Sequence, residues 1–455
     1  MRRWASCAVW LALLWIGPAV ALEGPRFADG YGIHVESQEQ LDARQLAVRV
    51  STGALQHPVD VRLLLPADYA ASPERDYPVL YLFHGTGGRA SDWVNAGDAV
   101  ATTDGLPLIV VMPDAGFNGD GGGWFADWFN GGSYGQPMWE TYHIGQLIPW
   151  IDDNLRTIAA RRARAVAGLS QGGFGSLSYA SRHPELFTSA AAFSGGCVID
   201  GDPEAIALST AIVQYTTTVL SGVADPDAIF GPRATQELNW QAHDPGTLVE
   251  NVRGMQIALW TGDGTPGELD PDPIDPGASS IEQITFGATM RYDDYLTEAG
   301  IKHAYHYYGG GTHIFPYWAR DLEEYVPALM RRFRQAKKDP SVVSYRAAAD
   351  RWEQWGWTVE LDRPEPAFST LERARRTGFL LTGTGTAHVT TPDVYRAGTK
   401  LRIVLKSDAG RTPSTATVGD DGRLQIDVPL SDDAEPATVR VAIRSARRPS
   451  PPSGY

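Results

Sequence analysis

The sequence predicts an α/β fold followed by a smaller all-β unit. Between residues 45 and 335, short apolar runs alternate with segments of helical spacing, a pattern typical of a mostly parallel sheet covered by helices on both faces. After residue 340, short strand-like segments follow one another without helices of similar length between them, which favours a small β-sandwich. With 455 residues, 43% of them hydrophobic, the chain is long and apolar enough for two folded units.

The charge balance and the cysteine content exclude several function classes. Lys and Arg total 39 against 54 Asp and Glu, which gives a formal net charge of −15. Because phosphate recognition needs a basic surface, this balance argues against a nucleic-acid partner. The two cysteines, Cys7 and Cys197, are too few for a disulfide framework, a Cys-rich zinc site or an iron–sulfur cluster.

The first residues resemble a secretory signal peptide. Arg2 and Arg3 precede an apolar run over residues 8–16, and Ala19-Val20-Ala21 offers the small residues that a signal peptidase reads. We expect cleavage after Ala21, a mature net charge of −17 and a secreted or cell-envelope location. The alternative is an uncleaved membrane anchor, but the run is shorter than the ~20 residues that cross a bilayer. No later segment is apolar enough to span one.

In chain order, the expected elements of the α/β unit (residues 22–338) are strands and helices in alternation. Two strands of alternating polarity come first, over 45–50 and 60–65. Continuous apolar runs, typical of central parallel strands, cover 79–83, 108–112, 163–169, 190–193 and 256–260. Helical spacing covers 140–154, 172–182, 281–299 and 317–337.

The C-terminal β-rich unit is expected over residues 339–446. Residues 344–354 are consistent with a short helix, and strand candidates then follow between turn-forming residues. These strands are expected over 357–361, 379–382, 387–390, 400–405, 424–428 and 438–443. The proline-rich tail, 447–455, is expected to be disordered.

A G-x-S-x-G motif marks the strongest candidate for a catalytic residue. Gly168 to Gly172 follow an apolar strand and lead directly into a helical segment, with Ser170 at the centre. In a nucleophile elbow, the serine sits on a tight, strained turn and the two glycines let strand and helix approach closely. The helix then directs its free N–H groups at a developing oxyanion. The alternative is a chance match on a surface loop, which the strand–turn–helix context disfavours.

The oxyanion donors are expected on two loops. One is the N–H group of Gln171, directly after the nucleophile. The other comes from the glycine-rich stretch His84-Gly85-Thr86-Gly87-Gly88, which follows the strand at 79–83. Its donor is Thr86 or Gly87, unless the stretch is only a turn.

A histidine and a carboxylate complete the candidate triad. His313 follows three glycines downstream of the elbow, and the order serine, acid, histidine fits this fold. Two acids compete: Asp263 in the loop after the strand at 256–260, and Glu282 at the start of the next helix. Either carboxylate could orient and charge-balance the imidazole, so spacing alone leaves the acid open.

Several motifs in order resemble the esterase branch of the α/β-hydrolases, which includes S-formylglutathione hydrolase-type esterases. The chain also resembles the secreted antigen 85 mycolyltransferases, over roughly residues 30–335. Besides the elbow, the resemblance rests on motifs spread along the unit: Asp127-Trp128, Trp139-Glu140-Thr141, Phe230-Gly231-Pro232, Gly262-Asp263-Gly264-Thr265-Pro266 with Glu268-Leu269, and Gly311-Thr312-His313 with Tyr317-Trp318.

This resemblance implies a Ser-His-Glu triad. The nucleophile falls on Ser170, the base on His313 and the acid on Glu282, in preference to Asp263. The oxyanion donors fall on Thr86 and Gln171. One departure concerns the acceptor, because the mycolyltransferases carry an Asp-Gly-Leu-Arg stretch that contacts trehalose where this chain has His84-Gly85-Thr86-Gly87. The β-rich unit has no counterpart in those shorter enzymes.

Other residues are candidates for lining a substrate site, namely His84, Trp128 and Phe315. The glycine- and aromatic-rich loop 121–132 fits either a substrate-gripping rim or a packed loop with its own small core. The acidic stretch with Asp263, Asp270, Asp272 and Asp275 fits a solvated loop better than a cation site, since bracketing histidines and a calcium-loop pattern are missing. We expect no metal at the site.

The sequence therefore predicts an exported serine ester hydrolase or acyltransferase that needs no metal or organic cofactor. Its substrate would be a small-molecule or lipid ester, such as a cell-envelope glycolipid. The acyl group would pass to water, or to the hydroxyl of a sugar or glycerolipid as in the mycolyltransferases and diacylglycerol acyltransferases. The alternative of another class is a non-catalytic cell-envelope binding protein built on a hydrolase scaffold.

Overall fold

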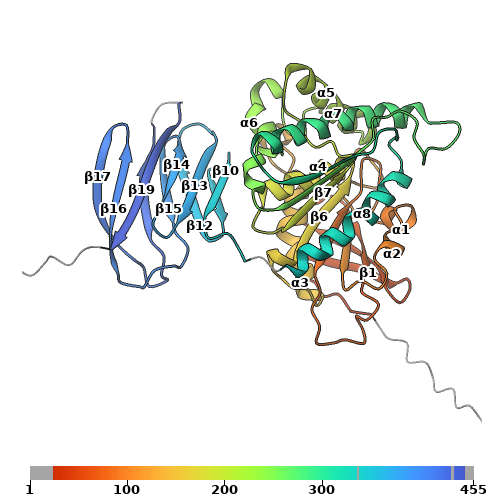
Figure 1. Ribbon diagram of the computed structural model, residues 1–455, viewed down its shortest axis with the longest axis horizontal. Helices are drawn as coiled ribbons and strands as arrows, with labels where there is room; N and C mark the ends of the chain where they lie inside the picture. Colours follow the sequence, from red (N-terminus) through yellow and green to blue (C-terminus); the bar gives the residue numbers. More distant parts are fainter. Residues whose placement is uncertain (1–23, 336–337, 432–434, 446–455) are drawn as a thin grey trace, which may run out of the picture.

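The structure is a computed structural model that describes residues 24–335, 338–431 and 435–445. It consists of an α/β unit followed by an all-β unit (Figure 1). The expected signal peptide, residues 1–21, and the expected disordered tail, residues 447–455, lie outside the described residues.

The α/β unit is built on a nine-stranded mixed sheet in the order β1-β2-β3-β5-β4-β6-β7-β8-β9. The strands from β5 to β9 in this order are parallel, whereas β1, β2 and β3 form an antiparallel edge. The strands are β1 (Ile33–Gln40), β2 (Gln45–Thr52), β3 (Val59–Leu64), β4 (Val79–Phe83), β5 (Ile109–Pro113), β6 (Arg164–Leu169), β7 (Ser189–Phe193), β8 (Gln256–Thr261) and β9 (His303–Tyr307).

Helices cover both faces of this sheet, as the sequence predicted (Figure 1). The α-helices are α1 (Asp92–Asn95), α2 (Ala99–Thr102), α3 (Ile148–Asn154), α4 (Gln171–Arg182), α5 (Pro203–Tyr215), α6 (Arg233–His243), α7 (Pro276–Glu298) and α8 (Phe315–Arg334). Short 3-10 or π turns are η1 (Asn130–Gly132), η2 (Thr141–Leu147), η3 (Arg161–Ala163), η4 (Thr216–Leu220) and η5 (Val249–Val252). Within the described residues, no helix is both long and apolar enough to cross a membrane.

The central strands are continuous apolar runs because both of their faces are buried. In β4, Val79, Tyr81 and Phe83 belong to the core under α3, α4 and α7. Leu80 and Leu82 belong to the opposite core, under α1, α2 and α8. Side chains of a strand point alternately to the two faces, so each such strand contributes to both cores. Burial on both faces holds these strands in place, and the candidate site lies at their C-terminal ends.

The all-β unit has two antiparallel sheets around one hydrophobic core. The larger runs β10-β13-β14-β19-β16-β17 and the smaller β11-β12-β15-β18. Their strands are β10 (Val343–Ala347), β11 (Arg351–Gln354), β12 (Trp357–Asp362), β13 (Ser369–Arg375), β14 (Gly378–Gly383), β15 (Thr386–Thr390), β16 (Lys400–Ser407), β17 (Gly410–Thr417), β18 (Gln425–Pro429) and β19 (Ala437–Ser445).

The expected helix over residues 344–354 is wrong, because this segment forms β10 and β11. Its buried residues alternate with exposed ones: Tyr345 is buried between outward neighbours, and so are Trp352 and Gln354 on β11. β10 pairs with β13 and β11 pairs with β12. Strand pairing in the folded unit therefore overrides the helix propensity of Ala347-Ala348-Ala349.

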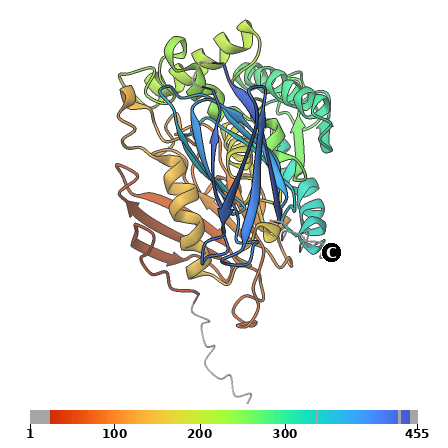
Figure 2. The same ribbon diagram turned by 90° about the vertical axis from the view of Figure 1, so that its left-hand side faces the viewer.

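The two units meet at the C-terminal end of α4. The carbonyl of Arg182 accepts a hydrogen bond from the Tyr345 hydroxyl at 2.7 Å, and Asn251 and Arg346 exchange two bonds of 2.9 Å. Burial alone would raise the pKa of the neighbouring Glu140, but the charge of Arg182 and the hydrogen bond from His183 outweigh it and lower the pKa well below its usual range. Figure 2 shows the all-β unit in front of the α/β unit.

Candidate active site

The serine of the G-x-S-x-G motif lies on a strained turn between β6 and α4. Ser170 has φ 51° and ψ −123°, a conformation that costs on the order of 1–3 kcal/mol for a residue with a side chain. The flanking glycines are required sterically. A Cβ at Gly168 would lie 2.4 Å from the Gly172 carbonyl oxygen, and one at Gly172 would lie 2.4 Å from the His84 carbonyl oxygen. This is the geometry of a nucleophile elbow.

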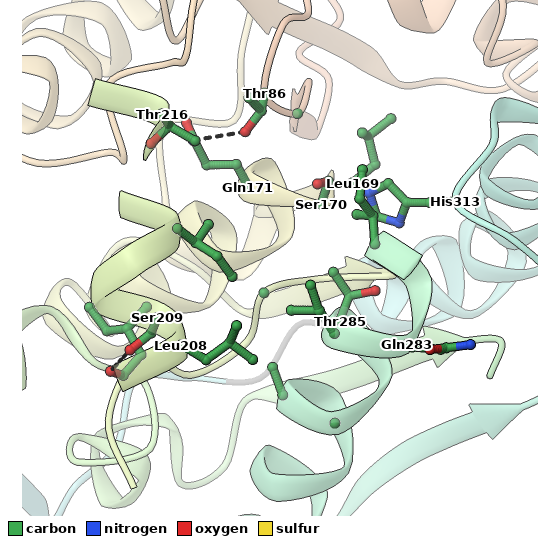
Figure 3. A pocket seen from close by; sticks show the side chains of 18 of the residues that line it. Thr86, Leu169, Ser170, Gln171, Leu208, Ser209, Thr216, Gln283, Thr285 and His313 are labelled. Atoms are coloured by element: carbon green, nitrogen blue, oxygen red, sulfur yellow. Dashed lines mark hydrogen bonds between the residues drawn. The ribbon is translucent and has the colours of Figure 1, made fainter. Parts of the chain in front are cut away.

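His313 is held by a buried carboxylate. Its Nδ1 lies 2.7 Å from Oε2 of Glu282, whose side chain is fully buried. The other ring nitrogen, Nε2, is buried and has no hydrogen-bond partner among the described residues. Ser170 and His313 line the same cavity, and Figure 3 shows their side chains next to each other. The serine, the imidazole and the acid thus lie next to one another, in that spatial order, at the C-terminal ends of the parallel strands.

The carboxylate of Glu282 is fixed by three further donors on its other oxygen. Oε1 accepts from the Ser194 hydroxyl at 2.8 Å, from the Thr261 hydroxyl at 3.0 Å and from the Gly262 N–H at 2.8 Å. These donors follow β7 and end β8, so the sheet itself holds the acid in place. Ser194 was not among the residues that the sequence singled out, since no motif surrounds it.

The two residues expected to supply the oxyanion donors both line the cavity beside Ser170. Thr86 follows β4, Gln171 is the first residue of α4, and both line the cavity with Ser170. The Gln171 side chain joins the loop after β4 to the loop that contains Gly121. Its Nε2 donates to Thr86 Oγ1 at 3.0 Å (Figure 3) and to the Gly121 carbonyl at 2.9 Å. An oxygen that gained negative charge beside Ser170 would lie near the positive, N-terminal end of α4, which begins at Gln171.

The cavity beside Ser170 has a volume of about 920 Å³. Away from the serine its wall comes from the segment after β7 and from α5, η4 and α7, and it is mainly apolar, with Glu204 and Arg291 among its charged residues. The apolar lining residues on this side are Val198, Ile199, Leu208, Ile212, Leu220, Ile284 and Ala288. The volume lies at the upper end of the usual range for small-molecule sites, roughly 300–1,000 Å³.

Comparison with known proteins assigns the family. A family model described as "Putative esterase" matches residues 52–329, more than half of the chain. The chain belongs to this esterase family. The resemblance predicted from its motifs is thereby confirmed, and so is the α/β-hydrolase fold of the larger unit.

Three relatives show how far the likeness extends. Esterase Rv1288 of Mycobacterium tuberculosis is 34% identical over 294 residues, which cover 63% of this chain and 59% of the relative. The match to that relative thus spans less than two thirds of its length. The diacylglycerol acyltransferase/mycolyltransferase Ag85B of Mycolicibacterium smegmatis is 27% identical over 49% of this chain and 67% of its own. The solved structure of Mycobacterium tuberculosis MPT51 has a TM-score of 0.50 at 21% identity, covering 63% of this chain and 97% of that one.

The structure brings Glu282, and not Asp263, to His313. Asp263 lies in the loop after β8, where its carboxylate accepts from the Thr265 N–H at 2.9 Å and the Tyr307 hydroxyl at 2.9 Å. The hydrogen bond from the Thr265 hydroxyl is the main reason that the pKa of Asp263 lies below its usual value. These contacts stabilise the loop and leave the imidazole to the glutamate.

Of the three predicted substrate-lining residues, only Phe315 lines the cavity. His84 is buried beneath the site, where its Nε2 accepts from the Ala115 N–H at 2.8 Å. Trp128 is buried in the core, and its indole N–H donates to the Gly123 carbonyl at 3.2 Å. Neither belongs to the cavity wall. Both were named because they flank glycine motifs, which does not reveal the direction of a side chain.

The glycine- and aromatic-rich loop 121–132 is mostly packed into the core, as one of the two interpretations predicted, and also contributes to the cavity wall, as the other predicted. Phe125, Trp128 and Phe129 are buried, and a Cβ at Gly175 of α4 would lie 2.2 Å from the Phe125 ring. Trp124 also lines the cavity, while its indole N–H donates to Thr216 Oγ1 at 2.8 Å. The loop is therefore a packed segment that contributes one indole to the wall.

Proposed function

We propose that this chain is an exported serine enzyme that cleaves carboxylic esters through an acyl-enzyme intermediate. The observation that carries the proposal is the pairing of His313 with the buried Glu282, beside Ser170 on its elbow, at one end of an apolar cavity. In this arrangement Glu282 holds the imidazole with its proton on Nδ1. Nε2, which has no hydrogen-bond partner in the described part of the chain, is then free to accept a proton.

In the first half-reaction, Ser170 Oγ attacks the ester carbonyl while His313 Nε2 takes the hydroxyl proton. The oxyanion of the tetrahedral intermediate accepts hydrogen bonds from the N–H groups of Gln171 and Thr86. Collapse of the intermediate breaks the ester C–O bond, and the leaving alcohol takes the proton from His313. Glu282 stays ionised and stabilises the imidazolium that forms in between.

In the second half-reaction, the acceptor attacks the acyl carbonyl while His313 Nε2 takes its proton. The bond between the acyl carbon and Ser170 Oγ then breaks, and His313 returns the proton to the serine. With water as acceptor the products are a carboxylic acid and free enzyme. With a hydroxyl acceptor the product is a new ester. The first half-reaction is the same in both cases, and the acceptor that competes best in the cavity decides the outcome.

The size and lining of the cavity favour a substrate whose acyl group has a medium to long chain. Its wall beyond the serine is formed mainly by aliphatic side chains of α5 and α7, although Glu204 of α5 and Arg291 of α7 also line it. Each buried methylene group gains about 0.8 kcal/mol. We therefore expect kcat/KM on p-nitrophenyl esters to rise from acetate to longer acyl chains.

Covalent labelling tests the proposal. A fluorophosphonate probe should label the wild-type chain, and Ser170→Ala should abolish the label without changing the circular dichroism spectrum. A wild-type chain that stays unlabelled and does not hydrolyse p-nitrophenyl esters would favour the alternative, a non-catalytic cell-envelope binding protein. Equal labelling of wild type and Ser170→Ala would refute the assignment of the nucleophile.

Acyl transfer is the second candidate function, because one relative is named a diacylglycerol acyltransferase/mycolyltransferase. The enzyme would be supplied with a short acyl donor together with sugars or a diacylglycerol, and the products identified by mass. A sugar ester or triacylglycerol indicates transfer, whereas free acid alone indicates hydrolysis. Export is tested separately, by finding the mature N-terminus of the secreted chain directly after Ala21.

A further inference from the structure

The charges of the chain are divided unevenly between its two units. Residues 1–339 carry 23 Lys and Arg against 40 Asp and Glu, a net charge of −17. Residues 340–455 carry 16 against 14, a net charge of +2. The positive charge of the second unit is concentrated further, on one part of its larger sheet.

Six basic side chains share the outer face of three neighbouring strands. On β16, Leu401 and Ile403 point into the core, so the residues between them point outward. On β19, Val441 and Ile443 point inward in the same way. The exposed outward residues, which we call the basic face, are Lys400, Arg402 and Lys406 of β16, Arg411 of β17, and Arg440 and Arg444 of β19.

The strand register places like charges directly opposite one another. Arg402 pairs with Arg444, and Lys406 pairs with Arg440 on one side and Arg411 on the other. Cross-strand neighbours of the same sign repel and destabilise a sheet. Within the described part of the chain, none of the six makes an ion pair or a side-chain hydrogen bond.

Among the residues that the structure describes, acidic side chains do not neutralise this face. Glu372 of β13 points the same way, but Leu380 of β14 stands between it and Arg440 in the register. Asp408 lies in the turn between β16 and β17, outside the paired rows. The six cations therefore form an uncompensated array on a chain whose other unit is strongly acidic, a cost that an anionic ligand would remove.

The dimensions of the basic face fit an extended polymer. Neighbouring strands lie ~4.8 Å apart and residues rise ~3.3 Å along a strand, so the array is roughly 10 Å wide and 20 Å long. Arginine offers a planar fork of donors that matches carboxylate geometry in two parallel bonds. The array is long enough for several successive anionic units of one ligand.

Features beside the array favour a polysaccharide over a lipid surface. β17 is the edge strand of its sheet, so half of its backbone N–H and C=O groups have no strand to pair with. Thr415 lies opposite Arg402 on the same face. These groups can hydrogen-bond to sugar hydroxyls. By contrast, no exposed large apolar side chain occurs on the described residues of β16, β17 or β19, and insertion into a bilayer needs such side chains.

We propose that the basic face binds a linear polysaccharide with repeated carboxylate groups. Figure 1 shows β16 and β17 at the end of the all-β unit that lies away from the α/β unit, so a bound polymer would leave the catalytic cavity open. The basic face thereby holds the enzyme on an acidic glycan, and this role is independent of the ester chemistry.

Binding of the full mature chain to polygalacturonate tests the proposal, with Kd measured by fluorescence anisotropy at 50 and 300 mM NaCl. The triple variant Arg402→Gln/Lys406→Gln/Arg440→Gln should bind at least 30-fold more weakly at low salt. The dependence of log Kd on log salt should fall by roughly two, since fewer counterions are released. These residues are exposed, so the melting temperature should stay within a few degrees of wild type.

The control removes three exposed arginines elsewhere, Arg49→Gln/Arg253→Gln/Arg396→Gln, and so changes the net charge equally. It should bind polygalacturonate within twofold of wild type. An equal loss in the control would show attraction by overall charge and overturn the proposal. So would an absence of wild-type binding, or binding as tight to phosphatidylglycerol vesicles or a DNA duplex as to polygalacturonate.

Discussion

Glu282→Gln is the substitution that tests the triad most directly. It replaces one carboxylate oxygen, a hydrogen-bond acceptor, by an amide NH₂ group, a donor, without changing the shape of the side chain. Ser194, Thr261 and Gly262 all donate to Oε1. They therefore require an oxygen at that position, which places the amide NH₂ of the glutamine toward His313 Nδ1. A donor there stabilises the tautomer with the proton on Nε2, and this tautomer cannot accept the proton of the serine.

The size of the effect follows from this tautomer. In serine proteases, the corresponding acid-to-amide change lowers kcat by about 10⁴-fold while the geometry stays intact. Here three donors fix the amide orientation, and so we expect a loss of 10³- to 10⁴-fold in kcat, or about 4–5.5 kcal/mol of transition-state stabilisation. The assay is the rate of acyl-enzyme formation with p-nitrophenyl esters and with the fluorophosphonate probe.

Asp263→Asn is the matched control, since Asp263 was the other candidate acid but lies on the loop after β8 and contacts Thr265 and Tyr307 instead of the imidazole. It should change kcat by no more than a few-fold. A Glu282→Gln variant within tenfold of wild type, or an Asp263→Asn variant that loses more activity than Glu282→Gln, would refute the assignment of the acid. Unchanged melting temperatures would exclude unfolding as the cause.

Three further predictions concern the loop beside the site, a buried carboxyl group and the boundary between the two units. Gln171→Ala removes the bonds that join Thr86 and Gly121, on two different loops, to α4 but keeps the backbone donor, so kcat should fall about 10–100-fold, and an unchanged kcat would show that the Thr86 loop is held without it. Asp321 is fully buried and its Oδ2 has no hydrogen-bond partner among the described residues; burial raises its pKa to about 7. Because the folded state holds this proton more tightly than the unfolded state, stability should fall as pH rises from about 4 to about 7, by on the order of 4 kcal/mol. Asp321→Asn should flatten this slope in urea unfolding at pH 5 and 8, and parallel slopes would contradict the prediction. A chain truncated after residue 338 should stay folded and hydrolyse p-nitrophenyl acetate near the wild-type rate, with a lower melting temperature because the Arg182 carbonyl loses its partner; an insoluble or inactive product would contradict that boundary.

The sequence predicted the parts of the site that depend on local geometry. Gly168, Ser170 and Gly172 specify the elbow because only glycine fits the two crowded positions. The glycines before His313 likewise specify a loop after a strand. The acid depends on tertiary structure, because α7 begins at Pro276 and must cross the ends of β7 and β8 before its second turn can reach the imidazole. Spacing therefore left two acids open, and only the resemblance favoured Glu282.

The cavity wall was the part that the sequence did not reveal. α5 carries apolar residues around most of its circumference, and within it only Val213 is buried, while Leu208 and Ile212 face the cavity. A helix with one side on the core and another on a cavity loses the single apolar stripe by which helices are recognised. In the all-β unit, β17 was missed because nearly all of its residues are exposed.

The position of α4 has a consequence for the molecule as a whole. Its first residue follows Ser170, and its last, Arg182, meets Tyr345 of the appended unit. Twelve residues at 1.5 Å each make a rod of about 18 Å. An enzyme tethered to a solid matrix by its C-terminal module would thus keep its reactive end turned away from the attachment point. Bulky lipids could then still reach that reactive end.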